Sequence, residues 1–274
     1  MNDTETTEEK QATHEILRLL ACSDLRKNLA KALRGGKKLT LSDLSEEVGA
    51  SSPAAVHALR ELGKENITSQ DEKRNYSLTN IGEIVVRKLD ELNVAIGALT
   101  RNRQFWLEHD LSDLPNSLLD KVAALAEGEV LVSTPTDLFK IFSTFYLLLD
   151  NAKEIRGVSP IFIDELTHQF VKLVAKDVEV ELVVTPEVLD AIIRTADRKE
   201  LENALKGKLK LFLIEPTPTV AFTVTDYFMQ LGFFRHDGTY DWSNDLLSYN
   251  PEAIQWGREA FDFYVEKAKP VTSL

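Results

Sequence analysis

The chain has 274 residues, of which 43% are hydrophobic and 28% charged, and its formal net charge at pH 7 is −12. This length and composition predict a globular protein with two domains and exclude a fibrous or wholly disordered one. Cys22 is the only cysteine, which excludes an internal disulfide and a cysteine-rich zinc site and favours a reducing, cytoplasmic location. The most apolar stretch, residues 141–149, is shorter than the roughly 20 residues of a membrane-spanning helix.

Charge is distributed unevenly along the chain. Residues 26–90 contain 12 Lys and Arg against 9 Asp and Glu, a net of +3, whereas residues 91–274 contain 18 against 29, a net of −11. Phosphate attraction acts locally, because salt screens charges beyond roughly 8 to 10 Å. The acidic total therefore does not exclude nucleic acid as a partner of the N-terminal part.

The N-terminal region begins with a polar segment and continues as helices. Residues 1–12 are acidic and lack the features of a secretory signal, so we expect a disordered tail. Apolar spacing predicts helix over residues 13–34, with a restart at Ser23, whose hydroxyl suits an N-cap. Cys22, beside that cap, is interpreted as a small core residue. Ser42 is expected to cap the next short helix.

The stretch GASSPAAVHALRELG, residues 49–63, predicts a further helix. Ser52 suits the N-cap and Pro53 the first helical position, where a missing N–H costs nothing. The side expected to face the core carries Val56, Leu59 and Leu62. A second, polar side carries His57, Arg60 and Lys64, which fall within about 60° of one another at 100° per residue.

A small hairpin and a long helix follow. ITSQ (residues 67–70) and NYSL (75–78) alternate like strands around the polar tip DEKRN, and Thr79 suits the cap of a helix over residues 80–103. That helix carries apolar residues at a and d positions of a heptad. These candidate dimerisation residues are Val85, Leu89, Leu92, Ile96 and Leu99. The alternative is a seam that packs within one chain.

Helix, helix, turn, helix and two-stranded wing, in this order over residues 13–80, predict a winged helix-turn-helix. Small residues at the start of the third helix would let its backbone approach the major groove, while basic residues suit base and phosphate contacts. The candidate DNA-binding residues are Lys37, Lys38, Ser51, Ser52, Ala54, Ala55, His57, Arg60, Lys64, Lys73 and Arg74. Since similar helical patterns occur in other proteins, a protein-interaction module remains the alternative.

The rest of the chain alternates between strand and helix patterns. Strands are predicted in residues 129–134, 154–160, 178–185 and 209–215, and an edge hairpin in residues 220–238 with a type I′ turn at Asp237-Gly238. A helix is predicted over residues 109–127, and an amphipathic helix over 252–268 closes the chain. The fold class is therefore α+β or α/β in two domains, with residues 81–103 linking the winged helix to a largely parallel, helix-covered sheet in residues 104–274.

Four strings carry a resemblance to a known family: RQFWLEHDLSDLP (103–115), IRGVSPIF (155–162), VEVELVVTPEVL (178–189) and VTDYFMQLGFFRHDGTYDWSNDLLS (224–248). With the winged helix, they resemble archaeal winged-helix regulators that have a C-terminal methanogenesis-regulator middle domain, first known as a domain of unknown function. The resemblance implies a transcriptional regulator whose second domain receives a small-molecule or metabolic signal. It implies neither the signal nor the operator.

The C-terminal half also looks, more distantly, like the phospholipase-D-like sensor domains of archaeal repressors. Active phospholipase D needs a His, a Lys and an Asp in a fixed motif, with His as the nucleophile. Here neither a His nor a Lys stands among the seven residues before Asp226, where the motif would place them. We therefore expect no enzyme, although a degenerate phosphodiesterase with an accessory winged helix remains the rival hypothesis.

No catalytic residue, metal site or cofactor is predicted. His236, Asp237 and Asp241 cluster in RHDGTYD, but they form no complete metal set and a turn explains them. Ligands of α/β sheets bind near strand ends, and aromatic residues can form an apolar wall. The candidate ligand-binding residues are Ser133, Thr134, Ser159, Thr185, Asp226, Phe234, Tyr240 and Trp242. The expected partners are double-stranded DNA, a second copy of the chain and a small-molecule effector, with no membrane.

Overall fold

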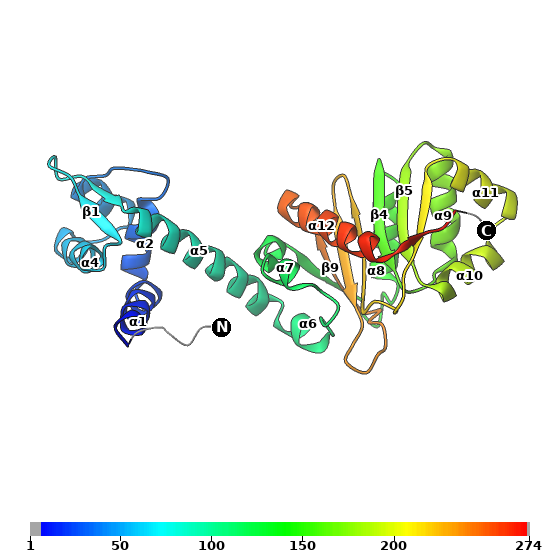
Figure 1. The fold of residues 1–274 in the computed structure, drawn as a ribbon, viewed down its shortest axis with the longest axis horizontal. Helices are drawn as coiled ribbons and strands as arrows, with labels where there is room; N and C mark the ends of the chain where they lie inside the picture. Colours follow the sequence, from blue (N-terminus) through cyan, green and yellow to red (C-terminus); the bar gives the residue numbers. More distant parts are fainter. Residues whose placement is uncertain (1–6, 273–274) are drawn as a thin grey trace. The chain divides into compact units, whose positions relative to one another are not determined.

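The computed structural model describes residues 7–272, and the side chains of residues 13–272 (Figure 1). The chain forms two compact units, Met1–Asn93 and Val94–Leu274, and the boundary between them falls inside helix α5 (Asn80–Arg101). Each unit has hydrophobic clusters of its own, as expected of separate domains. Of the expected tail, residues 1–6 lie outside the described part, whereas residues 7–12 belong to the first helix.

The N-terminal unit contains four helices before a two-stranded hairpin. The helices are α1 (Thr7–Ala21), α2 (Asp24–Ala32), α3 (Leu41–Glu47) and α4 (Ser52–Lys64), and the strands of the hairpin are β1 (Thr68–Gln70) and β2 (Tyr76–Leu78). Leu29, Leu44 and Leu59 are fully buried in one cluster, which holds α2, α3 and α4 together. The strands are antiparallel, with Ser69 opposite Ser77. The expected element order of a winged helix-turn-helix is therefore present.

The helix boundaries confirm one expected cap and correct others. Ser23 caps α2, since its hydroxyl accepts a hydrogen bond from Arg26 N at 3.4 Å. The prediction for Ser42 is wrong: Thr40 caps α3, and Thr40 and Asp43 satisfy each other's backbone N–H groups. Helix α4 starts at Ser52, so its N-cap is Ser51. Cys22 is exposed, not buried, because it lies in the turn between α1 and α2.

Two contacts fix the wing to the helices around it. Leu39 pairs with Tyr76 through hydrogen bonds in both directions, at 3.0 and 2.8 Å, so the segment before α3 extends the hairpin. The Thr79 hydroxyl accepts a hydrogen bond from Gly82 N at 3.0 Å, which caps α5 as expected. A Cβ atom on Gly82 would lie 2.0 Å from the Ile67 carbonyl oxygen. The Leu-Thr-x-x-Gly sequence therefore needs glycine for this close approach.

The segment that follows α5 forms three short helical elements, where one helix over residues 109–127 was expected. After α5 come α6 (Arg103–Glu108), α7 (Asn116–Leu119) and the 3-10 helix η1 (Val122–Leu125). The single helix predicted over residues 109–127 is wrong. Pro115 adopts an extended conformation and starts α7 as its N-cap, so the helical pattern is interrupted there.

The C-terminal unit is built on one mixed sheet of eight strands within the described residues. The strands are β3 (Glu129–Val132), β4 (Glu154–Ser159), β5 (Glu179–Val184), β6 (Leu209–Leu213), β7 (Val220–Thr225), β8 (Met229–Phe233), β9 (Asn244–Ser248) and β10 (Lys269–Pro270). Their order is β10-β6-β5-β4-β7-β8-β9-β3, and only β4, β5 and β6 pair in parallel. The prediction of a largely parallel sheet is wrong, because β7, β8 and β9 follow one another without crossover helices.

The hairpin of β7 and β8 lies in the middle of the sheet, not at its edge. Strand β7 pairs with β4 on one side, β8 pairs with β9 on the other, and both strands are completely buried. The predicted type I′ turn at Asp237-Gly238 is also wrong. Gly238 alone of the two has positive φ (81°), and its N–H donates to the Arg235 carbonyl. This is a type I turn followed by a left-handed glycine.

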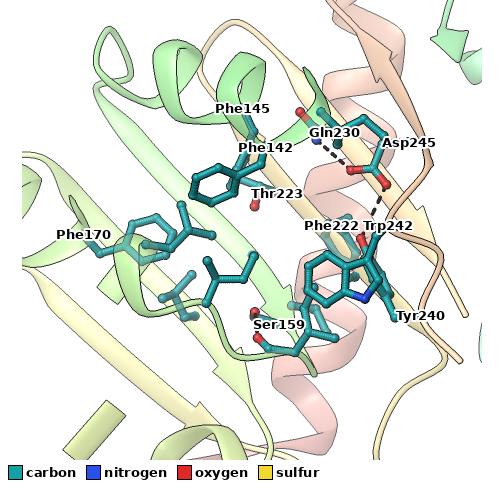
Figure 2. Close-up of a pocket in the computed structure, with 18 of the residues that line it drawn as sticks. Phe142, Phe145, Ser159, Phe170, Phe222, Thr223, Gln230, Tyr240, Trp242 and Asp245 are labelled. Atoms are coloured by element: carbon teal, nitrogen blue, oxygen red, sulfur yellow. Dashed lines mark hydrogen bonds between the residues drawn. The ribbon is translucent and has the colours of Figure 1, made fainter. Parts of the chain in front are cut away.

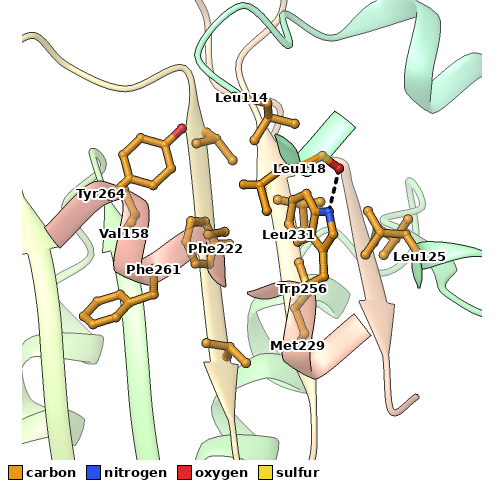
Figure 3. Packing of buried hydrophobic residues seen from close by; sticks show 14 of the residues in the cluster. Leu114, Leu118, Leu125, Val158, Phe222, Met229, Leu231, Trp256, Phe261 and Tyr264 are labelled. Atoms are coloured by element: carbon orange, nitrogen blue, oxygen red, sulfur yellow. Dashed lines mark hydrogen bonds between the residues drawn. The ribbon is translucent and has the colours of Figure 1, made fainter. Parts of the chain in front are cut away.

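Helices cover both faces of this sheet (Figure 1). One face packs on α12 (Pro251–Lys267), where Trp256 Nε1 donates to the Leu118 carbonyl at 2.9 Å (Figure 3). The other face packs on α8 (Lys140–Leu149), α9 (Asp164–Ala175), α10 (Pro186–Thr195) and α11 (Arg198–Lys206). Burial on two faces explains the apolar run Leu182-Val183-Val184 at the end of β5. No helix within residues 7–272 is long and apolar enough to cross a bilayer.

Candidate nucleic-acid interface and internal cavity

Helix α4 has a buried face and an exposed face. The buried face carries Ala55, Ala58, Leu59 and Leu62. Ala55 has an exposed fraction of 0% and packs in the cluster that joins α2 and α3, so its prediction as a DNA-contacting side chain is wrong. Val56 is only half-buried. The small side chains of Ala55 and Ala58 therefore let α4 approach the neighbouring helices closely.

The exposed face of α4 carries Ser51, Ser52, His57, Arg60 and Lys64, and Ala54 is half-buried beside it. His57 Nδ1 lies 3.7 Å from a Glu61 carboxylate oxygen, which also accepts a hydrogen bond from Arg26 at 2.6 Å. Arg60 and Lys64 form no ion pair with any residue from 13 to 272. Their charges are therefore free for a partner of opposite sign.

The start of α4 leaves backbone donors available. No side-chain hydrogen bond caps this helix, whereas α3 just before it has a complete capping box. The first N–H groups of a helix have no partner within the helix, and the helix dipole adds positive potential there. With Ser51 and Ser52 exposed, this end of α4 suits an anionic group.

The wing presents two further cations at its tip. Lys73 and Arg74 are exposed in the loop of residues 71–75, and Arg74 has a φ of 64°, in the left-handed region that favours glycine. Asp71 organises the loop: its carboxylate accepts from Asn75 N at 2.9 Å, and hydrogen bonds from Asn75 lower the pKa of Asp71. Asp71 is thus satisfied inside the loop, whereas Glu72, Lys73 and Arg74 are exposed at its tip.

Lys37 and Lys38 lie beside this wing, since the next residue, Leu39, pairs with β2. Both are exposed, and Lys37 Nζ is 4.0 Å from a Glu47 carboxylate oxygen. The predicted basic residues are therefore all exposed on the N-terminal unit, on α4, on the wing and in the segment before α3.

The C-terminal unit contains a cavity of about 260 Å³ on the sheet face that carries α8 and α9 (Figure 2). A row of paired residues crosses its floor, namely Leu182 on β5, Gly157 on β4, Thr223 on β7 and Gln230 on β8. A Cβ atom on Gly157 would lie 3.0 Å from the Phe222 carbonyl oxygen. Gly157 therefore keeps the floor low where a side chain would fill the space.

The walls of the cavity are apolar. Phe142 and Phe145 come from α8, Phe170 comes from α9, and the loop between β4 and α9 adds Ile161 and Ile163. Leu138, Phe139 and Trp242 also line it and are exposed, Phe139 at 75%. A smaller apolar cavity of about 40 Å³ adjoins it and shares Ser159, Leu166 and Phe170. Apolar walls and a few polar groups are features of small-molecule sites.

The polar end of the cavity is formed by Asp245, Gln230 and Tyr240 (Figure 2). Gln230 Nε2 donates to Asp245 Oδ2 at 2.7 Å, and the Tyr240 hydroxyl lies 3.5 Å from Asp245 Oδ1. Burial raises the pKa of the Asp245 carboxyl to about 6 and raises the pKa of Tyr240 well above its usual range. Perturbed carboxyl groups inside cavities are typical of functional sites.

The structure brings three of the eight candidate ligand-binding residues to this cavity: Ser159, Tyr240 and Trp242. Phe234 stacks edge-on against Tyr240, with ring centroids 5.3 Å apart. The other four, Ser133, Thr134, Thr185 and Asp226, do not line it. Thr134 and Asp226 accept backbone hydrogen bonds in turns, and Thr185 caps α10. Strand-end position alone was therefore too weak a criterion.

Sequence reasoning missed Asp245 and Gln230. The predicted elements include no strand over NDLLS, the residues of β9, and therefore give no reason to expect that Asp245 faces inward. The signal was available, because a charged residue next to two leucines in a buried strand needs a compensating role. Gln230 stands likewise in MQLGF, a strand in which every residue is buried.

A second buried polar contact joins the loop of residues 240–242, which lines the cavity with Tyr240 and Trp242, to His109 at the end of α6. His109 Nε2 lies 3.1 Å from Asp241 Oδ2, and His109 Nδ1 donates to the Phe105 carbonyl at 2.6 Å. Burial opposes ionisation of Asp241, but hydrogen bonds from Asn244, Ser243 and Arg235 outweigh it and lower the pKa of Asp241. In the cluster RHDGTYD, Asp241 thus holds His109, while Asp237 accepts from Thr239 in the turn.

The heptad residues of α5 separate into two groups. Val85 and Leu89 are half-buried against the N-terminal core cluster that includes Leu20 and Leu62, so they belong to that unit's own packing. Leu92 and Ile96 are each 52% exposed, and Leu99 is 36% exposed. The predicted apolar seam is therefore intramolecular in its first half and exposed in its second.

The segment before Asp226, where a phospholipase D motif would place its His and Lys, includes the buried strand β7. Val220 and Phe222 are buried in the cluster beneath α12, and Asp226 accepts a hydrogen bond from Lys153 N at 2.9 Å. None of the three supplies a nucleophile or its support there.

A winged helix joined by one long helix to a helix-covered sheet defines a two-domain winged-helix protein. Residues 14–97 match the family described as "Methanogenesis regulatory protein FilR1, N-terminal domain", and residues 138–267 match the one described as "Methanogenesis regulatory protein FilR1, middle domain". Together the two matches cover most of the chain. The chain belongs to this family of methanogenesis regulatory proteins.

Among relatives, the protein named "Methanogenesis regulatory protein FilR1" from Methanothrix harundinacea (strain 6Ac) is 26% identical over 257 residues. The match covers 92% of this chain and 57% of that protein, so the chain spans little more than half the length of its relative.

Two solved structures share parts of the fold at lower similarity. The archaeal chromatin protein TrmBL2 aligns with 96% of this chain and 100% of its own, at 17% identity and a TM-score of 0.43. Phosphatidylserine synthase from Haemophilus influenzae Rd KW20 aligns with 53% of this chain and 39% of its own, at 15% identity and a TM-score of 0.40. At TM-scores this low, neither likeness bears on function.

Proposed function

We propose that this protein is a DNA-binding transcriptional regulator whose C-terminal unit responds to a small molecule. The single observation that carries the proposal is the surface of α4. Arg60 and Lys64 form no ion pair among residues 13–272, and they lie on a helix whose N-terminus has no side-chain cap. Membership of a family of regulatory proteins supports the same conclusion.

In this proposal α4 enters the major groove. Its exposed serines approach the backbone, and Arg60 reaches a guanine edge while His57 and Lys64 contact bases or phosphates. Lys73 and Arg74 on the wing contact the minor groove or the backbone, and Lys37 and Lys38 bind further phosphates. Such contacts displace counterions, so affinity must fall steeply as the salt concentration rises.

The test is duplex binding at several salt concentrations, using fragments selected from genomic DNA. Affinity that falls linearly on a double-logarithmic salt plot supports DNA binding through phosphate contacts. A folded protein that captures no duplex, but does capture protein partners, would make the winged helix a protein-interaction module instead.

We further propose a homodimer that uses the exposed half of the α5 seam. Leu92, Ile96 and Leu99 follow the heptad spacing of a coiled-coil surface and are at least one third exposed. A two-fold dimer would present two α4 helices to a pseudo-palindromic operator. Sedimentation at micromolar concentration should show a dimer for the native protein and a monomer for the variant Leu92→Glu/Ile96→Glu. A monomeric native protein contradicts this proposal.

We also propose that the cavity communicates with α5 through α6. Tyr240 and Trp242 line the cavity, and Asp241 between them holds His109, which directly follows α6. A ligand that moves the loop of residues 240–242 would therefore move α6. Since the relative is named as a regulator of methanogenesis, genes of that process are the proposed targets.

A further inference from the structure

The cavity of the C-terminal unit has charge of one sign only. Among the described residues that line it, Asp245 is the single charged side chain, and no Lys, Arg or His is present. An anionic ligand would find no counter-charge there. A cationic ligand would find one, at the end of an otherwise apolar space.

Asp245 has no cation of its own among residues 13–272. Its carboxylate accepts from Gln230 Nε2 at 2.7 Å, and the Tyr240 hydroxyl is 3.5 Å away. The nearby cation Arg235 is already engaged, since it pairs with Asp241 at 3.0 Å, and His109 Nε2 lies 3.1 Å from the same Asp241 carboxylate. A buried carboxylate without a cation is costly, so its retention points to a partner that the cavity receives.

Gln230 provides a second, independent sign of a missing donor. Its side chain is about 95% buried, and its amide oxygen Oε1 has no hydrogen-bond partner among the described residues, although Nε2 is satisfied by Asp245. Buried polar atoms of this kind normally have partners. Two acceptor groups, Gln230 Oε1 and the Asp245 carboxylate, thus belong to neighbouring side chains at the same end of the cavity, and Oε1 lacks a hydrogen-bond donor among the described residues.

Aromatic rings stand beside these acceptors. The rings of Tyr240 and Trp242 are 4.8 Å apart and nearly perpendicular, at 75°, and both line the cavity (Figure 2). The faces of such rings attract ammonium groups. Carboxylate, amide oxygen and aromatic faces together form a site for an organic ammonium ion.

We propose that the cavity binds an organic amine: an apolar or aromatic body that ends in one protonated amino group. The ammonium N–H groups donate to the Asp245 carboxylate, next to Tyr240 and Trp242. The body lies between Phe142 and Phe170, and the adjoining apolar cavity receives a longer chain. This inference rests on the proposed effector role of the cavity, but it concerns ligand binding alone.

The experiment measures binding of three matched probes to the full-length protein without DNA. The probes are 4-phenylbutylamine, 4-phenylbutanol and 4-phenylbutyrate, which share one body and differ in charge. Calorimetry at pH 7.5 should show the amine binding at least about tenfold more tightly than the alcohol, and the carboxylate most weakly.

Two variants separate the Asp245 contact from general effects. Asp245→Asn should abolish the preference for the amine over the alcohol while leaving alcohol binding in place. Asp262→Asn removes an exposed carboxylate on α12, under the opposite face of the sheet, and should bind all three probes as the native protein does.

The pH dependence gives a second measurement that does not depend on a variant. The titratable groups around Asp245 are Tyr240, Asp241 and His109. Because the carboxyl pKa is about 6, amine affinity should fall between pH 7.5 and pH 5, and alcohol affinity should not.

Several results overturn the inference: equal affinities for the three probes, tightest binding of the carboxylate, an amine preference that survives Asp245→Asn, or no binding of any probe to folded protein. Because DNA is absent from these measurements, none of them bears on operator binding. A protein that binds the amine but no duplex would contradict the proposed regulator and leave this inference standing.

Discussion

The surface of α4 and the cavity of the C-terminal unit differ in the sign and in the burial of their charged groups. The α4 surface keeps its cations exposed, where water and salt reduce their cost, while Ala55 and Ala58 of the same helix are buried. The cavity buries one carboxylate among phenylalanines, where water cannot reduce its cost. The first site can therefore be stable without its partner. The second carries a destabilising group until a partner arrives, which suits a site that responds to a ligand.

The largest expected effect concerns the N-terminal scaffold. In Gly82→Ala the new Cβ would lie 2.0 Å from the Ile67 carbonyl oxygen, which is backbone and cannot move aside alone. We expect a loss of about 3 kcal/mol from the stability of this unit, at the upper end for overpacking. Thermal unfolding followed by circular dichroism measures it.

Gly97→Ala is the matched control for that substitution. Gly97 also lies in α5, and nothing stands within 4 Å of its added Cβ. Alanine should stabilise the helix by up to about 1 kcal/mol. Equal behaviour of the two variants would mean that Gly82 is not needed for the contact between α5 and the wing.

The next prediction tests whether the cavity stores a destabilising charge. The Asp245 carboxyl has a pKa of about 6 in the folded protein against an ordinary value of 3.8, so the folded state binds more protons between these pH values. Its contribution to stability is therefore greatest below about pH 4 and is lost as pH rises through 6, a change of at most about 3 kcal/mol.

Asp245→Asn should remove this pH dependence and raise the melting temperature at pH 7.5. The amide can still accept from Gln230 Nε2, and its own N–H can reach the unpartnered Gln230 Oε1. Melting curves at pH 4.5 and 7.5 compare the two proteins. A variant less stable than the native protein at both pH values would show that the carboxylate stabilises the fold instead.

The third prediction concerns the exposed site. Arg60→Ala should weaken operator binding by about 1 to 3 kcal/mol and relax specificity at one base pair, if Arg60 contacts a guanine. Titration of the operator and of its single-base variants measures both effects. Equal loss on every sequence would make Arg60 a phosphate contact, and the melting temperature should not change, because its side chain is exposed.

The sequence predicted α4 and the wing far better than it predicted the cavity of the C-terminal unit. Helix α4 and the wing depend on local signals such as Pro53, the alternation in NYSL, and the cap at Thr79, and the structure has each of those elements. The cavity depends on the order of the strands. Asp245, Gln230 and Gly157 come from three different strands and meet only because the β7–β8 hairpin lies in the centre of the sheet.

The same distinction explains the errors within the N-terminal unit. Periodicity correctly placed Leu59 and Leu62 in the core, whereas the small size of Ala55 at the start of the helix led to its prediction as a DNA-side residue. An alanine suits both a groove contact and a close helix packing, so its type does not decide between them. Only the crossing of α2 and α3 over α4, a tertiary feature, buries Ala55 completely.

The smallest expected effect concerns Arg74 at the tip of the wing, where stability and DNA affinity should change in opposite directions. Arg74 has a φ of 64°, a conformation that costs a non-glycine residue about 1 kcal/mol. Arg74→Gly should therefore raise the melting temperature of the N-terminal unit slightly. It should also weaken DNA binding and reduce the slope of its salt dependence by about 0.9, the value for one lost phosphate contact.

Lys73→Ala is the control, because Lys73 is exposed in the same loop and does not have a positive φ. It should reduce the salt slope in the same way without stabilising the unit. Opposite changes of stability and affinity in Arg74→Gly would mean that the wing retains a strained arginine for its contact with DNA. If Arg74→Gly stabilises the unit and leaves the salt slope unchanged, the tip of the wing does not contact DNA, and the nucleic-acid interface contracts to α4 and the lysines before α3.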